Sequence, residues 1–288
     1  MTALWQRQPV GIVGLGLIGG SLGLDLLARG AEVRAWVHRS ATAERARQRR
    51  LATEVSTDVR VLADCGMVVL ALPLDRLLAP DPTLVDALPA AAVVTDVGSV
   101  KASVVACWGP RLGGRFVASH PMAGTVHAGV EAGQLDLFRG RPWVATPDAT
   151  TAAPALVAVR ELAEALGAHW LTCEAAAHDR AVALISHLPV LVSAALLQTA
   201  DRATAAAPPL ASLVRALASS GFADTSRVGG GNPELGALMA RCNQGALLAA
   251  LERYREAITD LETLVRAGEW DVLQQELATC QQLRPPFL

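Results

Sequence analysis

The chain has little of several features that would assign a protein to a class. Lys101 is its only lysine, and a formal net charge of -2 gives no electrostatic footprint for nucleic acid or an anionic membrane. The five cysteines are scattered and never form a CxxC pair, so we expect reduced thiols and no metal site. No apolar run approaches the roughly 18 residues of a membrane span, and no basic segment leads into an apolar signal core. These absences predict a cytoplasmic protein without a nucleic-acid or membrane partner.

The sequence is rich in apolar residues, at 52% against 18% charged, which suffices to bury the core of one large or two modest domains. Its first half alternates short, valine-rich runs with amphipathic stretches at about 17–29, 41–51 and 101–112. Such alternation is typical of a parallel sheet with helices on both faces. Strands are expected at 10–16, 32–37, 67–72, 92–98, 115–121, 142–147 and 169–174, the last two around a helix at 152–166.

After Glu174 the strand pattern stops and long Ala/Leu-rich stretches follow. We therefore predict a doubly wound α/β domain over residues 1–174 and an all-helical domain over residues 175–288. Two stretches of the second domain, "LPVLVSAALL" and "LGALMARCNQGALLAAL", are more apolar than one helix face requires. Packing against a second copy would cover that surface, so we expect a homodimer through the helical domain.

A glycine motif follows the first expected strand. "GIVGLGLIGGS" fits GxGxxG with Gly14, Gly16 and Gly19, at a junction of strand and helix. The first glycine permits the tight turn, the second lets the backbone approach a pyrophosphate, and the third lets the helix pack on the strand. The amides that open the helix, including those of Leu17 and Ile18, then face the phosphates with a favourable dipole. The motif predicts a Rossmann-type dinucleotide site.

The end of the second expected strand lacks the carboxylate that would hold a free 2′-hydroxyl of the adenosine ribose. The chain has His38, Arg39 and Ser40 there, with Thr42 at the start of the next helix. A guanidinium and a hydroxyl hold a 2′-phosphate, which a carboxylate would repel. The pattern favours NADP as cofactor, and the alternative is a solvated, basic start of a helix.

Three strand ends carry candidate site residues, because ligands of doubly wound sheets bind beyond the carboxyl ends of the strands. Leu72 and Pro73 close one strand, "TDVGSVK" with Ser99 closes the next, and "SHPMAGT" with His120 closes the one after. A neutral imidazole with a pKa of ~6.5 suits removal of a hydroxyl proton. His120 is therefore the candidate base, and Ser99 is expected to hydrogen-bond its other ring nitrogen. The alternatives are a loop histidine and a serine that caps the helix at 100–112.

Several segments resemble the prephenate and arogenate dehydrogenases of tyrosine biosynthesis, over about residues 10 to 260. They are "GLGLIGGS", "TDVGSVK", "SHPMAGT", "HDRAVALISHLPV" and "SSGFADTSRVGGGNPELG". The resemblance implies a Rossmann domain, a helical dimerisation domain and oxidative decarboxylation of a cyclohexadienol. It makes His120 the catalytic histidine and Ser99 its partner, and it assigns Arg227 to the ring carboxylate of the substrate. It also places Thr125 and His187 in the substrate pocket.

The sequence departs from the prephenate-preferring relatives at two positions. Val126 stands where those relatives carry an acidic residue, and Val190 where they carry a second histidine. Together with Arg39 and Ser40, these departures favour the NADP-dependent, arogenate-using branch. Prephenate oxidation to 4-hydroxyphenylpyruvate with NAD or NADP is the alternative within the family.

Two further alternatives stay open at this point. One is another hydroxyacid dehydrogenase in which a lysine of the second domain does the acid-base chemistry. The position of Lys101 in the first domain counts against it. The other is a non-catalytic module that senses NADP. His178 and Asp179 are expected only to begin a helix, and Asn243 is a weak candidate for a substrate contact.

Overall fold

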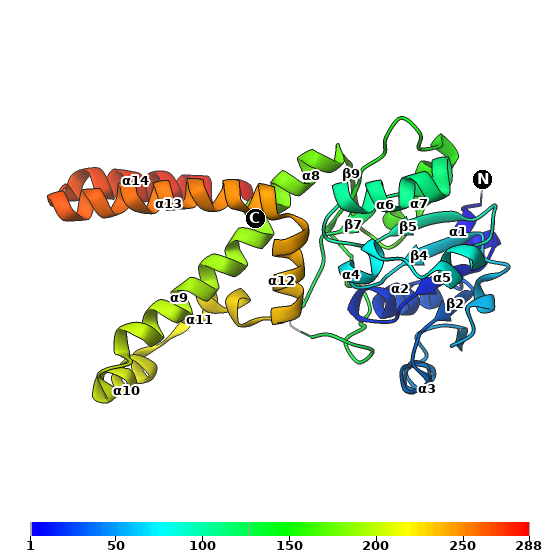
Figure 1. Ribbon diagram of the computed structural model, residues 1–288, viewed down its shortest axis with the longest axis horizontal. Helices are drawn as coiled ribbons and strands as arrows, with labels where there is room; N and C mark the ends of the chain where they lie inside the picture. Colours follow the sequence, from blue (N-terminus) through cyan, green and yellow to red (C-terminus); the bar gives the residue numbers. More distant parts are fainter. Residues whose placement is uncertain (1, 126, 288) are drawn as a thin grey trace.

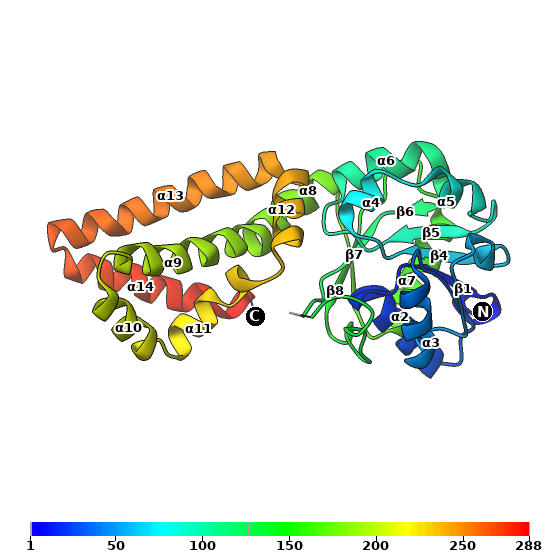
Figure 2. The same cartoon turned by 60° about the horizontal axis from the view of Figure 1, so that its bottom comes forward.

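The computed structural model describes residues 2–125 and 127–287, which divide into an α/β part and a helical part (Figures 1 and 2). Over these residues the α/β part has a six-stranded sheet in the order β3-β2-β1-β4-β5-β6 and a three-stranded sheet in the order β7-β8-β9. The strands are β1 Val10–Val13, β2 Val33–Trp36, β3 Glu54–Ser56, β4 Met67–Leu70, β5 Val93–Asp96, β6 Phe116–Val117, β7 Ser119–Pro121, β8 Pro142–Ala145 and β9 His169–Thr172.

Every strand pair of the larger sheet is parallel, as the alternation of strands and helices predicts. The connecting helices are α1 Leu4–Arg7, α2 Leu17–Ala28, α3 Ser40–Gln48, α4 Leu74–Leu78, α5 Pro82–Ala87, α6 Ala102–Leu112 and α7 Ala153–Ala165, with 3-10 turns at Val59–Leu62 and Gly113–Arg115. The fold is the doubly wound, Rossmann-type arrangement that the sequence predicts.

The central strands bury both of their faces, so they are almost purely apolar. Ile12 of β1 packs into one core with α2, α3 and α7, whereas its neighbour Val13 packs into a second core with α4 and α6. Met67 and Val68 of β4 divide between the two cores in the same way. Because successive side chains of a strand point to opposite faces, helices must cover both sides of this sheet.

The strand expected at 115–121 is two strands in the structure. β6 ends the parallel sheet beside β5, and after Ala118 the chain enters β7, which pairs antiparallel with β8. His120 lies opposite Val144 of β8, so it belongs to the smaller sheet rather than to the end of the larger one. Only Ala118 separates the two strands, and no glycine or charged residue marks the break, so it was not predictable from the residue pattern. The short strand β3 was also not predicted.

The helical part begins after β9 and contains no strand among the described residues. Its helices are α8 Ala175–Val182, α9 Leu188–Thr204, α10 Pro208–Leu217, α11 Ser220–Ser226, α12 Pro233–Cys242, α13 Gln244–Ala267 and α14 Trp270–Leu283, with short turns η3 Ala183–His187, η4 Val228–Gly230 and η5 Pro285–Phe287. η3 is a π-helical turn that joins α8 to α9 without a break. In Figure 1, α9 and the α13–α14 pair extend away from the α/β part.

The continuous run Ala175–Thr204 is long and apolar enough to cross a membrane by length and composition, with a mean hydropathy of 1.9 over an 18-residue window. A continuous helix of this length was not predicted from the sequence. Buried polar side chains interrupt its apolar surface at His178, Asp179, His187 and Ser193. Ser193 accepts a hydrogen bond from the amide of Gly229 in η4, at 2.8 Å. We therefore interpret the run as the central helix of the helical part.

Much of the apolar surface of the helical part is uncovered in a single chain. α10 and α14 bury no residue, and α13 buries only Leu247 and Ala250 among its 24 residues. Large apolar side chains on these helices are exposed, for example Leu217 at 71% and Trp270 at 61%. An isolated chain thus presents an apolar surface of the kind that marks an interface.

Candidate active site

The glycine turn between β1 and α2 has the geometry that a dinucleotide requires. Gly14 has a φ of +94°, and a side chain there would meet the carbonyl oxygen of Ala71 at 2.6 Å. At Gly19 a side chain would lie 2.0 Å from the carbonyl oxygen of Gly14. Gly16 faces open space, with nothing within 4 Å of the position of a side chain. The first and third glycines are therefore fixed by packing, while the second leaves room for a ligand beside the backbone.

The amides at the start of α2 are available to that ligand. Gly16 caps the helix without a side-chain hydrogen bond, and Leu17 and Ile18 are half-buried at its first positions. Unpaired amides and the positive end of the helix dipole together favour a phosphate at this turn. Leu72 and Pro73 lie between β4 and α4, where Ala71 contacts Gly14 and Gly19. The residues present thus fit a dinucleotide.

The basic segment after β2 is exposed where it precedes and opens α3. His38, Arg39 and Ser40 are exposed, and Thr42 is half-buried. Arginines further along are occupied: Arg47 of α3 donates to the Val55 carbonyl at 2.7 Å, and Arg49, just after α3, donates to the Gly133 carbonyl at 2.7 Å. In contrast, the side chain of Arg39 makes no hydrogen bond or ion pair within the described ranges.

A chain of hydrogen bonds joins His120 on β7 to the helical part. His120 Nδ1 lies 3.0 Å from His178 Nε2, and the two rings meet edge to face with centroids 5.2 Å apart. His178 Nδ1 lies 2.9 Å from Asp179 Oδ1. The two residues of α8 are buried, whereas His120 is half-buried. The three side chains thus stand in the order His120, which can act as a base, then the His178 imidazole, then the Asp179 carboxylate.

The carboxylate of Asp179 also caps helix α6. Its Oδ1 accepts the Lys101 amide at 2.7 Å, and its Oδ2 accepts the Ala102 amide at 2.9 Å. Burial alone would raise the pKa of Asp179, but the hydrogen bonds from His178 and from these two amides outweigh it and hold the pKa below its usual value. Asp179 is therefore a carboxylate and accepts from His178 rather than donating to it.

Among the described residues, Ser99 makes neither the predicted hydrogen bond to His120 nor the alternative, a side-chain cap of α6. It is half-buried ahead of α6, and no hydrogen bond from it to His120 is found in the described part of the chain. His178 pairs with His120 Nδ1 instead, and Asp179 supplies the cap of α6. Neither residue was predicted for these roles, because α8 reaches the turn before α6 only through the tertiary fold.

An ion pair beneath the site holds the backbone ahead of His120. Lys101 Nζ contacts Asp96 Oδ2, and it donates to the Ser119 carbonyl at 2.7 Å. The Ser119 amide donates in turn to Asp96 Oδ1 at 3.1 Å. Lys101, Asp96 and Ser119 are completely buried. Burial lowers the pKa of Lys101 below its usual value, and the Asp96 carboxylate opposes that shift.

The environment of His120 keeps its ring neutral. Burial, and then the charges of Lys101, His178 and His187, hold the pKa of His120 well below its ordinary 6.5. An unprotonated ring nitrogen is what proton removal requires. Its Nε2 makes no hydrogen bond with the residues that the structure describes, so the structure leaves this nitrogen available.

His187 presents a second ring nitrogen that lacks a partner. Asn243, which precedes α13, donates its amide to the Asp179 carbonyl at 2.7 Å and lies 3.2 Å from His187 Nδ1. A carbonyl only accepts, so the atom facing both groups is the amide nitrogen, and His187 Nδ1 accepts. In the neutral ring, Nε2 then carries a hydrogen. That atom is buried without a partner among the described residues.

Other predicted residues stand apart from this cluster. Arg227 is exposed between α11 and η4, and no hydrogen bond joins it to His120 within residues 2–125 and 127–287. Thr125 is exposed and accepts the His127 amide at 3.2 Å. Val190 is half-buried and would contact a side chain added at Gly236. Val126 lies outside the described residues.

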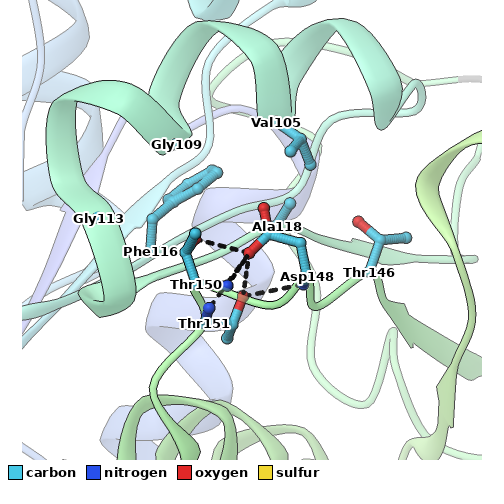
Figure 3. A pocket seen from close by; sticks show the side chains of 9 residues that line it. All are labelled: Val105, Gly109, Gly113, Phe116, Ala118, Thr146, Asp148, Thr150 and Thr151. Carbon is cyan, nitrogen blue, oxygen red and sulfur yellow. Dashed lines mark hydrogen bonds between the residues drawn. The ribbon is translucent and has the colours of Figure 1, made fainter.

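A small pocket near the cluster is too tight for a substrate. It lies between α6, β6 and the turn at Asp148, and encloses about 10 Å³, room for about one water (Figure 3). Asp148 Oδ1 closes the turn by accepting from the Thr150 amide at 2.8 Å and the Thr151 amide at 3.1 Å. This pocket belongs to a turn and not to the site around His120.

The parallel sheet and its glycine turn define the class: the α/β part is the nucleotide-binding domain of a dehydrogenase. Residues 22–172 match the family described as prephenate dehydrogenase, nucleotide-binding domain, and residues 174–279 match prephenate dehydrogenase, dimerization domain. The chain belongs to the prephenate dehydrogenase family, as its motifs predict.

Relatives of known sequence and structure agree with this assignment. A cyclohexadienyl dehydrogenase of Zymomonas mobilis is 29% identical over 282 residues, covering 96% of this chain and 95% of the relative. The crystal structure of Synechocystis arogenate dehydrogenase has a TM-score of 0.84 at 40% identity and covers 97% of this chain and 100% of its own. Prephenate dehydrogenase from A. aeolicus, crystallised with hydroxyphenyl propionate and NAD+, has a TM-score of 0.90 at 26% identity over 98% and 99%.

Proposed function

We propose that the protein oxidatively decarboxylates L-arogenate to L-tyrosine with NADP, using His120 as the base. The proposal rests on one observation: His120 is held neutral on β7, and its Nε2 is free of hydrogen bonds with the described residues. The 40% identity to the arogenate dehydrogenase of Synechocystis supports arogenate as the substrate. Residues 1–174 are then the NADP-binding domain, and residues 175–288 the dimerisation and substrate-binding domain.

The chemistry needs a base and little further help from the protein. His120 Nε2 takes the proton of the ring hydroxyl as a hydride leaves the same carbon. A bound nicotinamide supplies the acceptor for that hydride. The dienone then loses carbon dioxide, and the electrons of the broken C–C bond make the ring aromatic and leave a phenolate oxygen. The proton held on His120 returns to that oxygen, so the histidine is restored.

Residues of the helical part supply the groups for the substrate carboxylates. The hydrogen on His187 Nε2 is buried and unpaired, and an unpaired buried donor is costly unless a ligand accepts from it. A carboxylate or carbonyl oxygen of the substrate would satisfy it. The exposed guanidinium of Arg227 offers two parallel donors that match the ring carboxylate. Thr125 and Ser99 complete the proposed substrate contacts.

The choice of cofactor is proposed from the segment at Arg39. The side chain of Arg39 has no partner among the described residues, whereas those of Arg47 in α3 and Arg49 just after it are occupied. The exposed hydroxyl of Ser40 and the flanking His38 and Thr42 add donors at this point. Two charge-assisted hydrogen bonds of roughly 1.5–3 kcal/mol each would favour a 2′-phosphate over a hydroxyl.

Replacing this guanidinium should weaken the binding of one cofactor alone. For Arg39→Ala we expect the Kd of NADP to rise about tenfold to a hundredfold, since each 1.4 kcal/mol is tenfold. The Kd of NAD should stay unchanged, and fluorescence titration of both reduced cofactors measures this. Arg50→Gln removes the same charge from an exposed arginine just after α3 and serves as the control. Equal losses of NADP and NAD binding in Arg39→Ala would contradict the assignment.

A direct assay tests the reaction. Arogenate and prephenate are each paired with NAD and with NADP, and the absorbance of the reduced cofactor is followed. We expect the highest kcat/KM for arogenate with NADP, because the site has an arginine at the ribose position and valine at positions 126 and 190. Prephenate with NAD as the best pair would refute both the substrate and the cofactor. Absence of turnover with all four pairs would refute the enzyme activity itself.

We also propose that the protein works as a cytoplasmic homodimer. α10, α13 and α14 bury few of their apolar side chains in one chain, and a groove on α10 and α11 is lined by Val214, Leu217 and Phe222. Burying such surface stabilises association at about 25 cal/mol per Å². The match of residues 174–279 to a dimerization domain supports a second copy as the partner.

A further inference from the structure

Three ionisable side chains lie in line from Asp179 through His178 to His120. The two links measure 2.9 Å between Asp179 Oδ1 and His178 Nδ1, and 3.0 Å between His178 Nε2 and His120 Nδ1. Two of the three side chains are buried, so water does not compete for these contacts. Each of the three ring nitrogens in these two contacts has one partner, and that partner determines whether the nitrogen donates or accepts.

The carboxylate at the far end sets the direction of both hydrogen bonds. Asp179 accepts the amides of Lys101 and Ala102 at the start of α6, where the helix dipole also favours a negative charge. As an ionised acceptor it requires His178 Nδ1 to donate. In a neutral ring the other nitrogen, Nε2, then carries only a lone pair and must accept from His120 Nδ1. The remaining nitrogen of His120, its Nε2, is left with a lone pair.

We propose that Asp179 and His178 are positioning residues that fix His120 as its Nδ1–H tautomer and so expose Nε2 as the base. This inference rests on the proposed function, in which Nε2 receives the hydroxyl proton. When that proton arrives, the His120 ring becomes a cation whose Nδ1–H faces His178, and the charge of Asp179 acts on it through the line. The proton later returns from Nε2 to the phenolate oxygen, and no other reactant is needed.

The arrangement also makes the base depend on both parts of the molecule. His120 belongs to β7 of the α/β part, whereas His178 and Asp179 belong to α8, the first helix of the helical part. Asp179 is fixed to α6 by two backbone amides, and its own carbonyl accepts the amide of Asn243 at 2.7 Å. The same residue thus holds the two parts together and orients the base between them.

The tautomer is measurable on the unaltered protein, without substrate. The full chain is labelled with 15N in its histidines, of which there are six, and the ring nitrogen shifts are recorded at neutral pH. We expect the His120 spectrum of an Nδ1–H ring, with Nε2 unprotonated. The spectrum of His178→Phe, which keeps an aromatic ring but removes both hydrogen bonds, should revert to the Nε2–H form that free imidazole side chains prefer.

Turnover gives the second readout. In His178→Phe and Asp179→Asn we expect kcat to fall about 10²-fold or more, by analogy with loss of the orienting carboxylate in other imidazole bases. KM and the Kd of the cofactor should change less than about threefold, because neither side chain touches a ligand. His169→Phe makes the same replacement at an exposed histidine of β9 and should leave kcat unchanged.

Each outcome distinguishes this inference from the proposed function. A wild-type His120 ring in the Nε2–H form, or a doubly protonated His178, would overturn the inference even if the variants fail to fold. Folded variants with the kcat of the wild-type protein would overturn it too. If the unaltered protein turns over neither arogenate nor prephenate, the proposed function fails, while the 15N spectrum still decides the tautomer.

Discussion

With His120 replaced by asparagine, kcat is expected to fall about 10²–10⁴-fold, while the Kd of the dinucleotide stays unchanged. The size of the loss follows from the role of a positioned base, and among the described residues His120 Nε2 is an unpaired ring nitrogen with a lone pair, whereas the unpaired nitrogen of His187 carries a hydrogen. Cofactor affinity should survive because the glycine turn and the start of α2 lie on other elements. Stopped-flow absorbance of the reduced cofactor measures kcat, and fluorescence titration measures the Kd.

The matched control is His169→Asn, which alters an exposed histidine and should leave both constants unchanged. Because burial keeps the pKa of His120 well below 6.5, the unaltered enzyme should hold its kcat/KM as the pH is lowered through 6.5. A His120 variant that turns over substrate at the wild-type rate would remove this residue from the mechanism. Binding of NADP without turnover of any substrate by the unaltered protein would instead favour a module that only binds NADP.

The sequence predicts the parallel sheet well because its signals are local. Each central strand is a short, apolar run, and Ile12 and Val13 need only alternate to fill both cores. The motif of Gly14, Gly16 and Gly19 is recognisable in the sequence because the turn needs glycine at each position for a separate reason. The division of the run at 115–121 was not predictable in this way, since only Ala118 separates the two strands and no glycine or charged residue marks the break.

The site was only partly predictable for a related reason. His120 and His187 were named as site residues, whereas His178 and Asp179, although they open the segment that holds His187, were assigned only to the start of a helix. Their function depends on contacts that are distant along the chain: His178 contacts His120, 58 positions before it, and Asp179 contacts Lys101, 78 positions before it. Sequence spacing does not predict contacts of this range. A histidine and an aspartate just ahead of a long apolar run were the one available sign, and Asn243 offered even less.

The second large effect is on stability and concerns the single lysine. Lys101 and Asp96 form an ion pair that is completely buried, and each partner also makes a hydrogen bond to the backbone of Ser119. Removing one member leaves the other charge buried without its counter-ion, which typically costs about 3–5 kcal/mol. We expect Lys101→Met to lower the free energy of unfolding by that amount, measured by urea denaturation.

The control for this prediction is an ion pair between a basic residue and an aspartate that is exposed to solvent. Arg60 pairs with Asp58 at the surface, where its side chain is 86% exposed. Arg60→Met should therefore change the free energy of unfolding by less than about 1 kcal/mol. A loss of similar size in the two variants would show that burial adds nothing to the Lys101–Asp96 pair, contrary to the geometry.

Because Lys101 is the only lysine, its accessibility is also measurable by an amine-reactive reagent and mass spectrometry. In the folded protein the amine is fully buried, so it should react only when the structure opens. Asp96→Asn keeps the lysine but removes its counter-ion, and we expect Lys101 to be labelled at least a hundredfold faster, since 3 kcal/mol exceeds two powers of ten. The Lys101–Asp96 pair holds Ser119, the residue before His120. Faster labelling of Lys101 in Asp96→Asn should therefore be accompanied by loss of turnover. Rapid labelling of Lys101 in the unaltered protein would contradict the buried pair.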